Sequence, residues 1–259
     1  MAKFAANLTM LYTEFDFLER FEKAAQSGFK AVEFLFPYDY EPELLAEYLR
    51  KYQLEQALFN LYPGNWAGGE KGFASLPGEE TRFRQSVEQA IPYAVAMGCK
   101  KVHVMSGIMN PKIDRATHEK TFISNVRYAG DQFAKYGIKV VLEPLNSRDV
   151  PNYFISHQRE AVELIKRIER DNVFLQFDVY HAQIMDGDLT VLIQNLAPYI
   201  GHVQIASVPA RNEPTLGEVN FNHIFNILDN AGYQDWIGCE YNPKTTTEEG
   251  LGWFKSLNN

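Results

Sequence analysis

Four residues with oxygen-donor side chains follow, or lie within, short apolar runs in the second half of the chain. They are Glu143 in Val-Val-Leu-Glu, Asp178 in Leu-Gln-Phe-Asp, Gln204 in His-Val-Gln-Ile and Glu240 in Ile-Gly-Cys-Glu. Three carboxylates brought to one place repel one another, so the arrangement is costly without a cation. Carboxylate and amide oxygens favour a hard divalent ion, and we therefore expect Mg²⁺ or Mn²⁺ rather than zinc.

An acidic residue after a strand also has a purely structural use, because it can cap the helix that follows. Pro144 makes this use less suitable for Glu143. Capping explains any single residue of the four well. It explains four on consecutive runs poorly, so we interpret them together as a set of metal ligands.

Four further polar residues lie near the same runs, and we expect them to contact a substrate. His181 comes three residues after Asp178, and Arg211 follows a later run. A planar guanidinium suits a substrate carboxylate. Glu33 and His103 lie in earlier runs. The competing roles are packing or helix initiation for His181, a solvated surface position for Arg211, and buried structural positions for the other two.

The segments that hold these residues alternate between two patterns. Apolar runs predict eight strands, at Phe4–Asn7, Ala31–Phe36, Gln56–Asn60, Lys101–Met105, Lys139–Glu143, Val173–Asp178, His202–Ser207 and Trp236–Glu240. Between them, apolar residues recur at helical spacing. Eight strand-then-helix units in about 250 residues predict an α/β fold, a (β/α)₈ TIM barrel with its active site at the carboxyl ends of the strands. We expect a single domain over residues 1–259.

Two segments within this pattern carry further predictions. Val87, Ile91 and Val95 form an apolar stripe that we expect to face the sheet, with a bend at Pro92. The segment Leu61–Gly78 is rich in glycine, which indicates a mobile lid over a small polar substrate. A passive surface insertion is the competing interpretation. Its Gly68-Gly69-Glu70-Lys71-Gly72 run lacks the Ser or Thr of a P-loop.

Composition excludes several classes of protein. Of 259 residues, 33 are acidic and 25 basic, which gives a net charge of −8 without any Lys/Arg-rich run. This balance argues against a nucleic-acid partner. Two cysteines rule out a disulfide scaffold. No apolar stretch approaches the ~20 residues of a membrane span, and the N-terminus does not resemble a signal peptide. We expect a cytoplasmic protein without a membrane partner, and leave a homo-oligomer open.

Several longer segments resemble the hydroxypyruvate isomerase family, which includes the 2-oxo-tetronate isomerases, within the xylose-isomerase-like group of TIM barrels. They are Phe4-Ala5-Ala6-Asn7-Leu8, Val32-Glu33-Phe34-Leu35-Phe36-Pro37-Tyr38, Pro63-Gly64-Asn65-Trp66-Ala67, Gly201-His202-Val203-Gln204-Ile205-Ala206 and Gly238-Cys239-Glu240-Tyr241. The resemblance extends over nearly the whole chain.

The resemblance implies a metal-dependent isomerase of small sugar acids. It implies that Glu143 and Glu240 are the acid/base pair and that both hold the metal with Asp178 and Gln204. Two reactions fit the family: hydroxypyruvate to tartronate semialdehyde, and 2-oxo-tetronate to 3-oxo-tetronate. His103 in Val-His-Val-Met-Ser-Gly is more similar to the second branch.

Other activities stay open at this point. The same group of barrels contains sugar epimerases and an apurinic endonuclease with three zinc ions, and a non-catalytic sugar-acid binding protein is a third alternative. The net charge and the Glu/Asp/Gln set argue against the endonuclease. Proton transfer through an enediolate and a direct hydride shift are not distinguished by the sequence.

Overall fold

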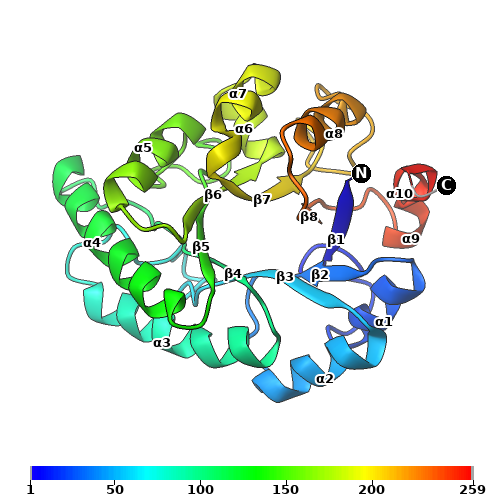
Figure 1. Cartoon of the computed structure of the whole chain (residues 1–259), viewed down its shortest axis with the longest axis horizontal. Coiled ribbons are helices and arrows are strands. Elements are labelled where there is room, and N and C mark those ends of the chain that lie inside the picture. Colours follow the sequence, from blue (N-terminus) through cyan, green and yellow to red (C-terminus); the bar gives the residue numbers. More distant parts are fainter. Residues whose placement is uncertain (1, 258–259) are drawn as a thin grey trace.

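The computed structural model describes residues 2–257 and forms a closed barrel of eight parallel strands (Figure 1). The strands are β1 (Lys3–Asn7), β2 (Ala31–Glu33), β3 (Glu55–Asn60), β4 (Lys101–His103), β5 (Lys139–Leu142), β6 (Val173–Asp178), β7 (Ile200–Ile205) and β8 (Trp236–Cys239). Each pairs with its neighbours in chain order, and β1 pairs with β8 to close the barrel. The predicted TIM barrel is confirmed.

Helices surround the barrel on the outside (Figure 1). They are α1 (Glu19–Gln26), α2 (Pro42–Tyr52), α3 (Glu80–Ala96), α4 (Arg115–Ala134), α5 (Gln158–Ile168), α6 (Val179–Met185), α7 (Leu189–Leu196), the 3₁₀ turn η1 (Ala197–Tyr199), α8 (Phe221–Asn230), α9 (Thr247–Gly250) and α10 (Gly252–Leu257). Within residues 2–257, no helix has the length and apolar character needed to cross a membrane.

All eight predicted strands exist, but most have shifted ends. β2 ends at Glu33 rather than Phe36, and β4 ends at His103 rather than Met105. Apolar residues beyond the strand ends, such as Phe34 and Val104, are nevertheless buried. The apolar pattern therefore continues past the last ladder hydrogen bond, and this is why the predicted carboxyl ends of β2 and β4 lie beyond the observed ones.

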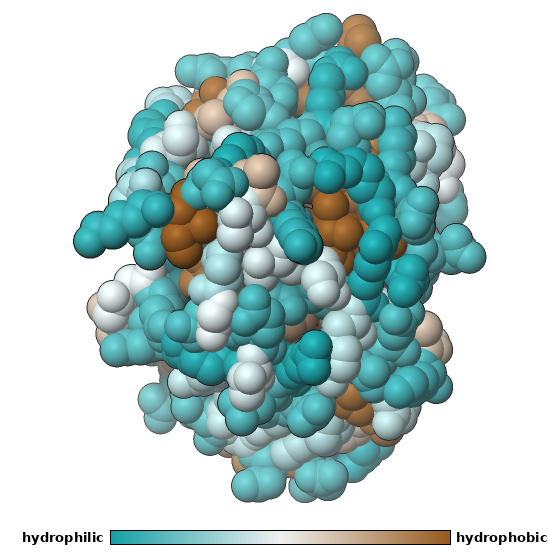
Figure 2. Space-filling view, turned by 90° about the vertical axis from the view of Figure 1, so that its left-hand side faces the viewer, coloured by the Kyte–Doolittle hydropathy of each residue, from teal (hydrophilic) through white to brown (hydrophobic). Residues whose placement is uncertain are grey.

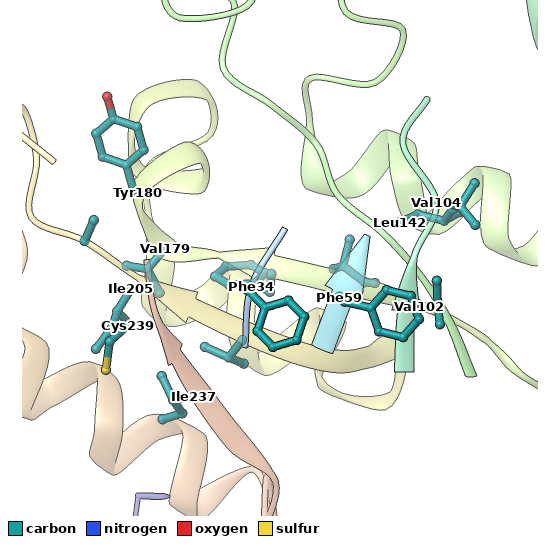
Figure 3. Close-up of a cluster of buried hydrophobic side chains, with 14 of the residues drawn as sticks. Phe34, Phe59, Val102, Val104, Leu142, Val179, Tyr180, Ile205, Ile237 and Cys239 are labelled. Carbon is teal, nitrogen blue, oxygen red and sulfur yellow. The ribbon is translucent and has the colours of Figure 1, made fainter. Parts of the chain in front are cut away.

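Alternation along the strands separates an apolar core from a polar barrel interior. Val102, Leu142, Ile205 and Ile237 belong to the buried apolar cluster shown in Figure 3. Successive strand residues point to opposite faces, so their neighbours point into the barrel. Those neighbours include many of the charged and amide side chains discussed below.

The stripe predicted on α3 is partly wrong. Val95 is 55% exposed, and Ile91 is only partly buried. The buried apolar positions of α3 are instead Phe83, Val87, Ala90 and Ala94. Alanines let the helix approach the barrel closely, but they contribute little to an apolar pattern read from the sequence. The helix continues through Pro92.

The surface shown in Figure 2 is mostly hydrophilic, with apolar residues in small separate groups. Two of the large apolar side chains that are exposed, Tyr62 and Trp66, lie in the glycine-rich segment 61–78. Trp66 also lines a pocket, together with residues at the carboxyl ends of several strands.

Candidate active site

A pocket of about 270 Å³ lies where several strands end. Its volume suits a small ligand, since pockets for drug-sized molecules start at about 300 Å³. The lining residues come from loops and strand ends around the barrel. They are Met10, Leu35, Asn60, Trp66, Lys71, His103, Met105, Glu143, Leu145, Asp149, Val150, His181, Arg211 and Glu240.

Three side chains from neighbouring elements converge beside this pocket. Glu143 follows β5, Asp178 ends β6, and His181 lies in α6. One ligand-type atom of each lies within 4.8 Å of the other two. Asp178 also caps α6, because its Oδ1 accepts the Tyr180 N–H at 2.7 Å. Its second oxygen is left for the cluster, so the capping role and a site role coexist.

The hydrogen bonds of His181 determine which ring nitrogen carries the proton. Its Nδ1 accepts from the backbone N–H of Asn146 at 3.0 Å and from that residue's side-chain amide at 2.8 Å. The proton therefore resides on Nε2, which lies 3.6 Å from Asp178 Oδ2 and 4.0 Å from Glu143 Oε1. Burial lowers the pKa of His181 well below its usual value, so the ring is neutral. It suits donation of a hydrogen bond better than metal ligation.

Arg211 lies between two carboxylates of the site. Its backbone has φ +54°, a left-handed conformation uncommon outside glycine, and its N–H donates to Ser207 O at 2.8 Å. From this position Nη2 lies 2.5 Å from Glu240 Oε2 and 3.9 Å from Asp178 Oδ2. The other oxygen of Glu240 is 3.5 Å from the Asn7 amide nitrogen.

Burial makes ionisation of these carboxyl groups costly. It raises the pKa of Glu143 well above its usual value, with further contributions from Glu240 and Asp178. It also raises the pKa of Glu240 to about 8 and that of Asp178 to about 6, and in both cases Arg211 opposes the shift. One guanidinium therefore faces three buried carboxyl groups, which leaves the site short of positive charge.

The donor set fits a hard divalent ion. Glu143 Oε1 and Asp178 Oδ2 are buried and lack a hydrogen-bond partner among residues 2–257. Both atoms belong to residues of the converging cluster. Unpaired carboxylate oxygens in a buried acidic site are ligands of the kind that Mg²⁺ and Mn²⁺ require.

Beneath the pocket, a second group of polar side chains fills the barrel. Glu33 accepts hydrogen bonds from Asn7 at 2.9 Å, from His202 at 2.7 Å and from Gln204 at 2.7 Å. Lys101 lies 3.4 Å from the other ring nitrogen of His202. Gly238 makes room for this group, because a Cβ there would collide with both oxygens of Glu33.

The polar side chains inside the barrel form two groups, the upper layer and the deep layer. The upper layer contains His103, Glu143, Asp178, His181, Arg211 and Glu240. The deep layer contains Asn7, Glu33, Lys101, Gln176, His202 and Gln204.

Six of the eight residues expected at the site lie in the upper layer, and two do not. Glu33 does not line the pocket, and its carboxylate accepts hydrogen bonds from three deep-layer side chains. Gln204 donates to Glu33 and accepts from Gln176 at 2.5 Å through Oε1. His103 lines the pocket, with Nδ1 at 3.6 Å from Glu143 Oε2, and burial lowers its pKa to about 3.

Lys71 is a residue of the pocket that was not predicted from the sequence. Lys71 lines the pocket, and its Nζ lies 3.1 Å from the centroid of the Trp66 ring. The available signal was a lone cation in a glycine-rich segment beside a tryptophan. The lack of a P-loop pattern in this segment does not exclude a lysine that lines the pocket.

A larger pocket, of about 340 Å³, lies at the opposite end of the barrel. Its lining includes Lys139, Ile200 and Asp235, which start or precede strands. Active sites of TIM barrels lie at the carboxyl ends of the strands, so we place the active site in the smaller pocket.

Comparison with known proteins identifies relatives along the full chain. Residues 21–257 match the family model of xylose isomerase-like TIM barrels. The chain is 51% identical over 253 residues to the 2-oxo-tetronate isomerase of Pectobacterium atrosepticum, which covers 98% of this chain and 97% of the relative. It is 45% identical over 254 residues to the hydroxypyruvate isomerase of Escherichia coli, covering 98% of each.

Solved structures agree on the fold. A Brucella melitensis structure, named as an AP endonuclease of family 2, matches with a TM-score of 0.97 and 53% identity over 99% of both chains. An L-ribulose 3-epimerase, at 21% identity and a TM-score of 0.77 over 99% of this chain and 86% of its own, shares the fold alone. The chain therefore belongs to the xylose isomerase-like TIM barrel family and, within it, is an isomerase of the hydroxypyruvate isomerase family that includes the 2-oxo-tetronate isomerases.

Proposed function

We propose that the protein converts 2-oxo-tetronate to 3-oxo-tetronate in a reaction that depends on Mg²⁺ or Mn²⁺. The observation that carries the proposal is a pair of buried carboxyl groups, Glu143 and Glu240, that line one small pocket. They enter it from β5 and β8, which are separated by β6 and β7. The relative with 51% identity is named for this reaction. Hydroxypyruvate is the three-carbon alternative.

In this mechanism the two glutamates exchange protons with adjacent carbons of the substrate. One carboxylate removes the proton from the carbon that bears the hydroxyl group, which gives an enediolate. The other glutamate, protonated at the start, gives its proton to the neighbouring carbon, while the hydroxyl proton passes to the former carbonyl oxygen. Proton exchange with water then restores the two glutamates. Without the ion, burial raises the pKa of both groups; a bound cation would oppose this shift and keep a glutamate ionised, and so able to act as a base, near neutral pH.

Glu143, Asp178, Gln204 and Glu240 would hold the metal ion. When bound, the ion polarises the carbonyl and hydroxyl oxygens of the substrate and so acidifies the C–H between them. Gln204 would contribute the second lone pair of Oε1, since Gln176 uses only one.

The remaining upper-layer groups would orient the substrate. His181 presents Nε2–H toward the acidic cluster, and both ring nitrogens of His103 are buried without a hydrogen-bond partner among residues 2–257. The Nε of Arg211 is likewise a buried donor without an acceptor in the part of the chain described. These groups suit the hydroxyl and carbonyl oxygens of a small sugar acid.

An NMR assay tests the proposal directly. The protein is mixed with three- and four-carbon 2-oxo acids in D₂O, with Mg²⁺, with Mn²⁺ or with a chelator. We expect metal-dependent conversion of 2-oxo-tetronate, with deuterium on the product carbon that gains hydrogen. Absence of turnover on every acid would contradict the proposal. Turnover without deuterium would instead support a hydride shift or a shielded proton.

The name of the Brucella protein raises DNA cleavage as a second candidate. The net charge of −8 and the lack of a basic run oppose it, because binding to the DNA backbone depends on Lys and Arg. We propose no nucleic-acid partner, and we expect a duplex with an apurinic site to remain uncut under the conditions of the isomerase assay.

A further inference from the structure

Two cations line the pocket, Lys71 and Arg211, and their surroundings differ. Arg211 is paired with Glu240 and lies near Asp178. Its positive charge therefore offsets the acidic groups of the upper layer. A substrate carboxylate that approached Arg211 would compete with these groups and would be repelled by them.

Lys71 is not paired with a carboxylate of the described residues in this way. Its Nζ is held over the Trp66 ring, and no carboxylate of residues 2–257 lies within ion-pair distance of it. The adjacent Glu70 is engaged by Arg82, with N–O distances of 2.8 and 2.9 Å, and by the Asn65 N–H at 2.5 Å. Partial burial lowers the pKa of Lys71, which reflects lost hydration of the ammonium group.

The backbone next to Lys71 is fixed against the barrel. Gly72 has φ +92°, and a Cβ there would collide with the backbone carbonyl of Met105. The N–H of Gly72 also donates to Pro63 O at 3.0 Å. The lysine is thus presented to the pocket from an anchored position, although it belongs to a glycine-rich loop.

We propose that Lys71, held on the face of Trp66, binds the carboxylate of the substrate. This inference rests on the proposed function, since it takes the substrate to be a sugar acid. In a 2-oxo acid the carboxylate adjoins the reacting carbons, so the cation that binds it has to line the same small pocket, as Lys71 does. The compact ammonium group can meet the carboxylate while its stem stays on the ring.

Calorimetric binding of erythronate, a four-carbon sugar acid without the oxo group, tests this role without turnover. In the presence of Mg²⁺ we expect Lys71→Met to bind the acid about 10- to 100-fold more weakly than the unchanged protein, as for loss of a charge-assisted hydrogen bond. Lys71→Arg keeps the charge and is expected to restore most of the affinity. Equal losses in both variants, or no loss in Lys71→Met, would overturn the inference.

Lys23→Met provides a matched control. Lys23 is also half-buried and lies over an aromatic ring, that of Phe15 at 4.4 Å, but it does not line the pocket. We expect it to bind erythronate normally, and an equal loss there would also contradict the assignment. The outcome is separate from the proposed reaction: a protein that binds the acid through Lys71 but turns over no 2-oxo acid keeps this inference and loses that function.

Discussion

The upper and deep layers lie one above the other in the barrel, both buried and both rich in charge. Five buried atoms of the upper layer lack a hydrogen-bond partner within residues 2–257: His103 Nδ1 and Nε2, Glu143 Oε1, Asp178 Oδ2 and Arg211 Nε. In the deep layer, Gln176 Oε1 is the one buried atom without such a partner in the described part of the chain. Buried polar groups are normally paired, so unpaired ones require an explanation.

The difference indicates which layer is structural and which is functional. In the deep layer the Glu33 carboxylate meets three donors, and His202 lies between Glu33 and Lys101. Such a network stabilises one arrangement of the barrel interior. In the upper layer the unpaired atoms lower the free energy of unfolding. Such destabilising features are found in proteins where ligands bind.

The largest expected effect follows from changing the upper layer. Glu143→Gln and Glu240→Gln nearly preserve side-chain size but remove a base, so isomerisation should fall by about 10²–10⁴-fold. Glu143→Gln removes a buried carboxyl group with an unpaired oxygen, so stability should stay the same or rise. Glu240→Gln also removes the charge that faces Arg211, so its stability should be the lower of the two. Turnover by NMR and urea unfolding measure the two quantities, with metal content determined in each variant. Near-normal turnover in a metal-bound variant would remove that glutamate from the acid/base pair.

A change in the deep layer should lower stability and leave ligand binding largely unaffected. Glu33→Gln replaces one acceptor oxygen by a donor facing other donors, and we expect the free energy of unfolding to fall by about 1–3 kcal/mol. Erythronate binding, measured by calorimetry, should change little because Glu33 does not line the pocket. A stable variant that has lost binding would show that the two layers are not functionally distinct.

The pH dependence of stability should originate in the upper layer. Burial raises the pKa of Glu240 from 4.5 to about 8, so the folded state retains a proton that the unfolded state releases above about pH 4.5. In chelator-treated protein the free energy of unfolding should therefore fall as pH rises from about 5 to about 8, by on the order of 1 kcal/mol per pH unit. Urea unfolding across this range measures the slope. Glu240→Gln should reduce the slope; an unchanged slope in this variant would exclude the glutamate as its source.

Gln204 lies at the boundary between the two layers. It hydrogen-bonds within the deep layer, yet we propose it as a metal ligand. Gln204→Leu should lower Mn²⁺ affinity by at least about tenfold in a folded protein. Gln176→Leu is the control, because it removes the donor that competes for Oε1 and should not weaken metal binding. Unchanged metal affinity in Gln204→Leu would assign Gln204 to the deep layer alone.

The fold could be predicted from the sequence because eight short, largely apolar segments alternate with segments of helical spacing. The errors have local causes. Phe34 and Val104 are buried beyond the ladder, so the predicted strands extend too far. On α3, Ala90 and Ala94 are the buried residues, whereas Val95, which has greater apolar weight, is exposed.

Only the residues of the site that lie at or just after strand ends could be predicted from the sequence. Strands of a barrel are tilted and staggered, so residues near the ends of different strands lie at different heights. This stagger, together with the short β2, accounts for Glu33 lying below the pocket although it ends its strand. Lys71 could not be placed, because nothing in a glycine-rich segment shows which barrel strand it packs against.

The position of Trp66 gives the protein an optical signal of its own. The chain has three tryptophans, all within residues 2–257. Trp66 is 41% exposed at the pocket, Trp253 is 9% exposed in the apolar core, and Trp236 packs on small alanines inside the barrel. A molecule that enters the pocket displaces water from one indole and leaves the other two untouched. Occupancy of the site can therefore be followed by the intrinsic fluorescence of the unmodified chain.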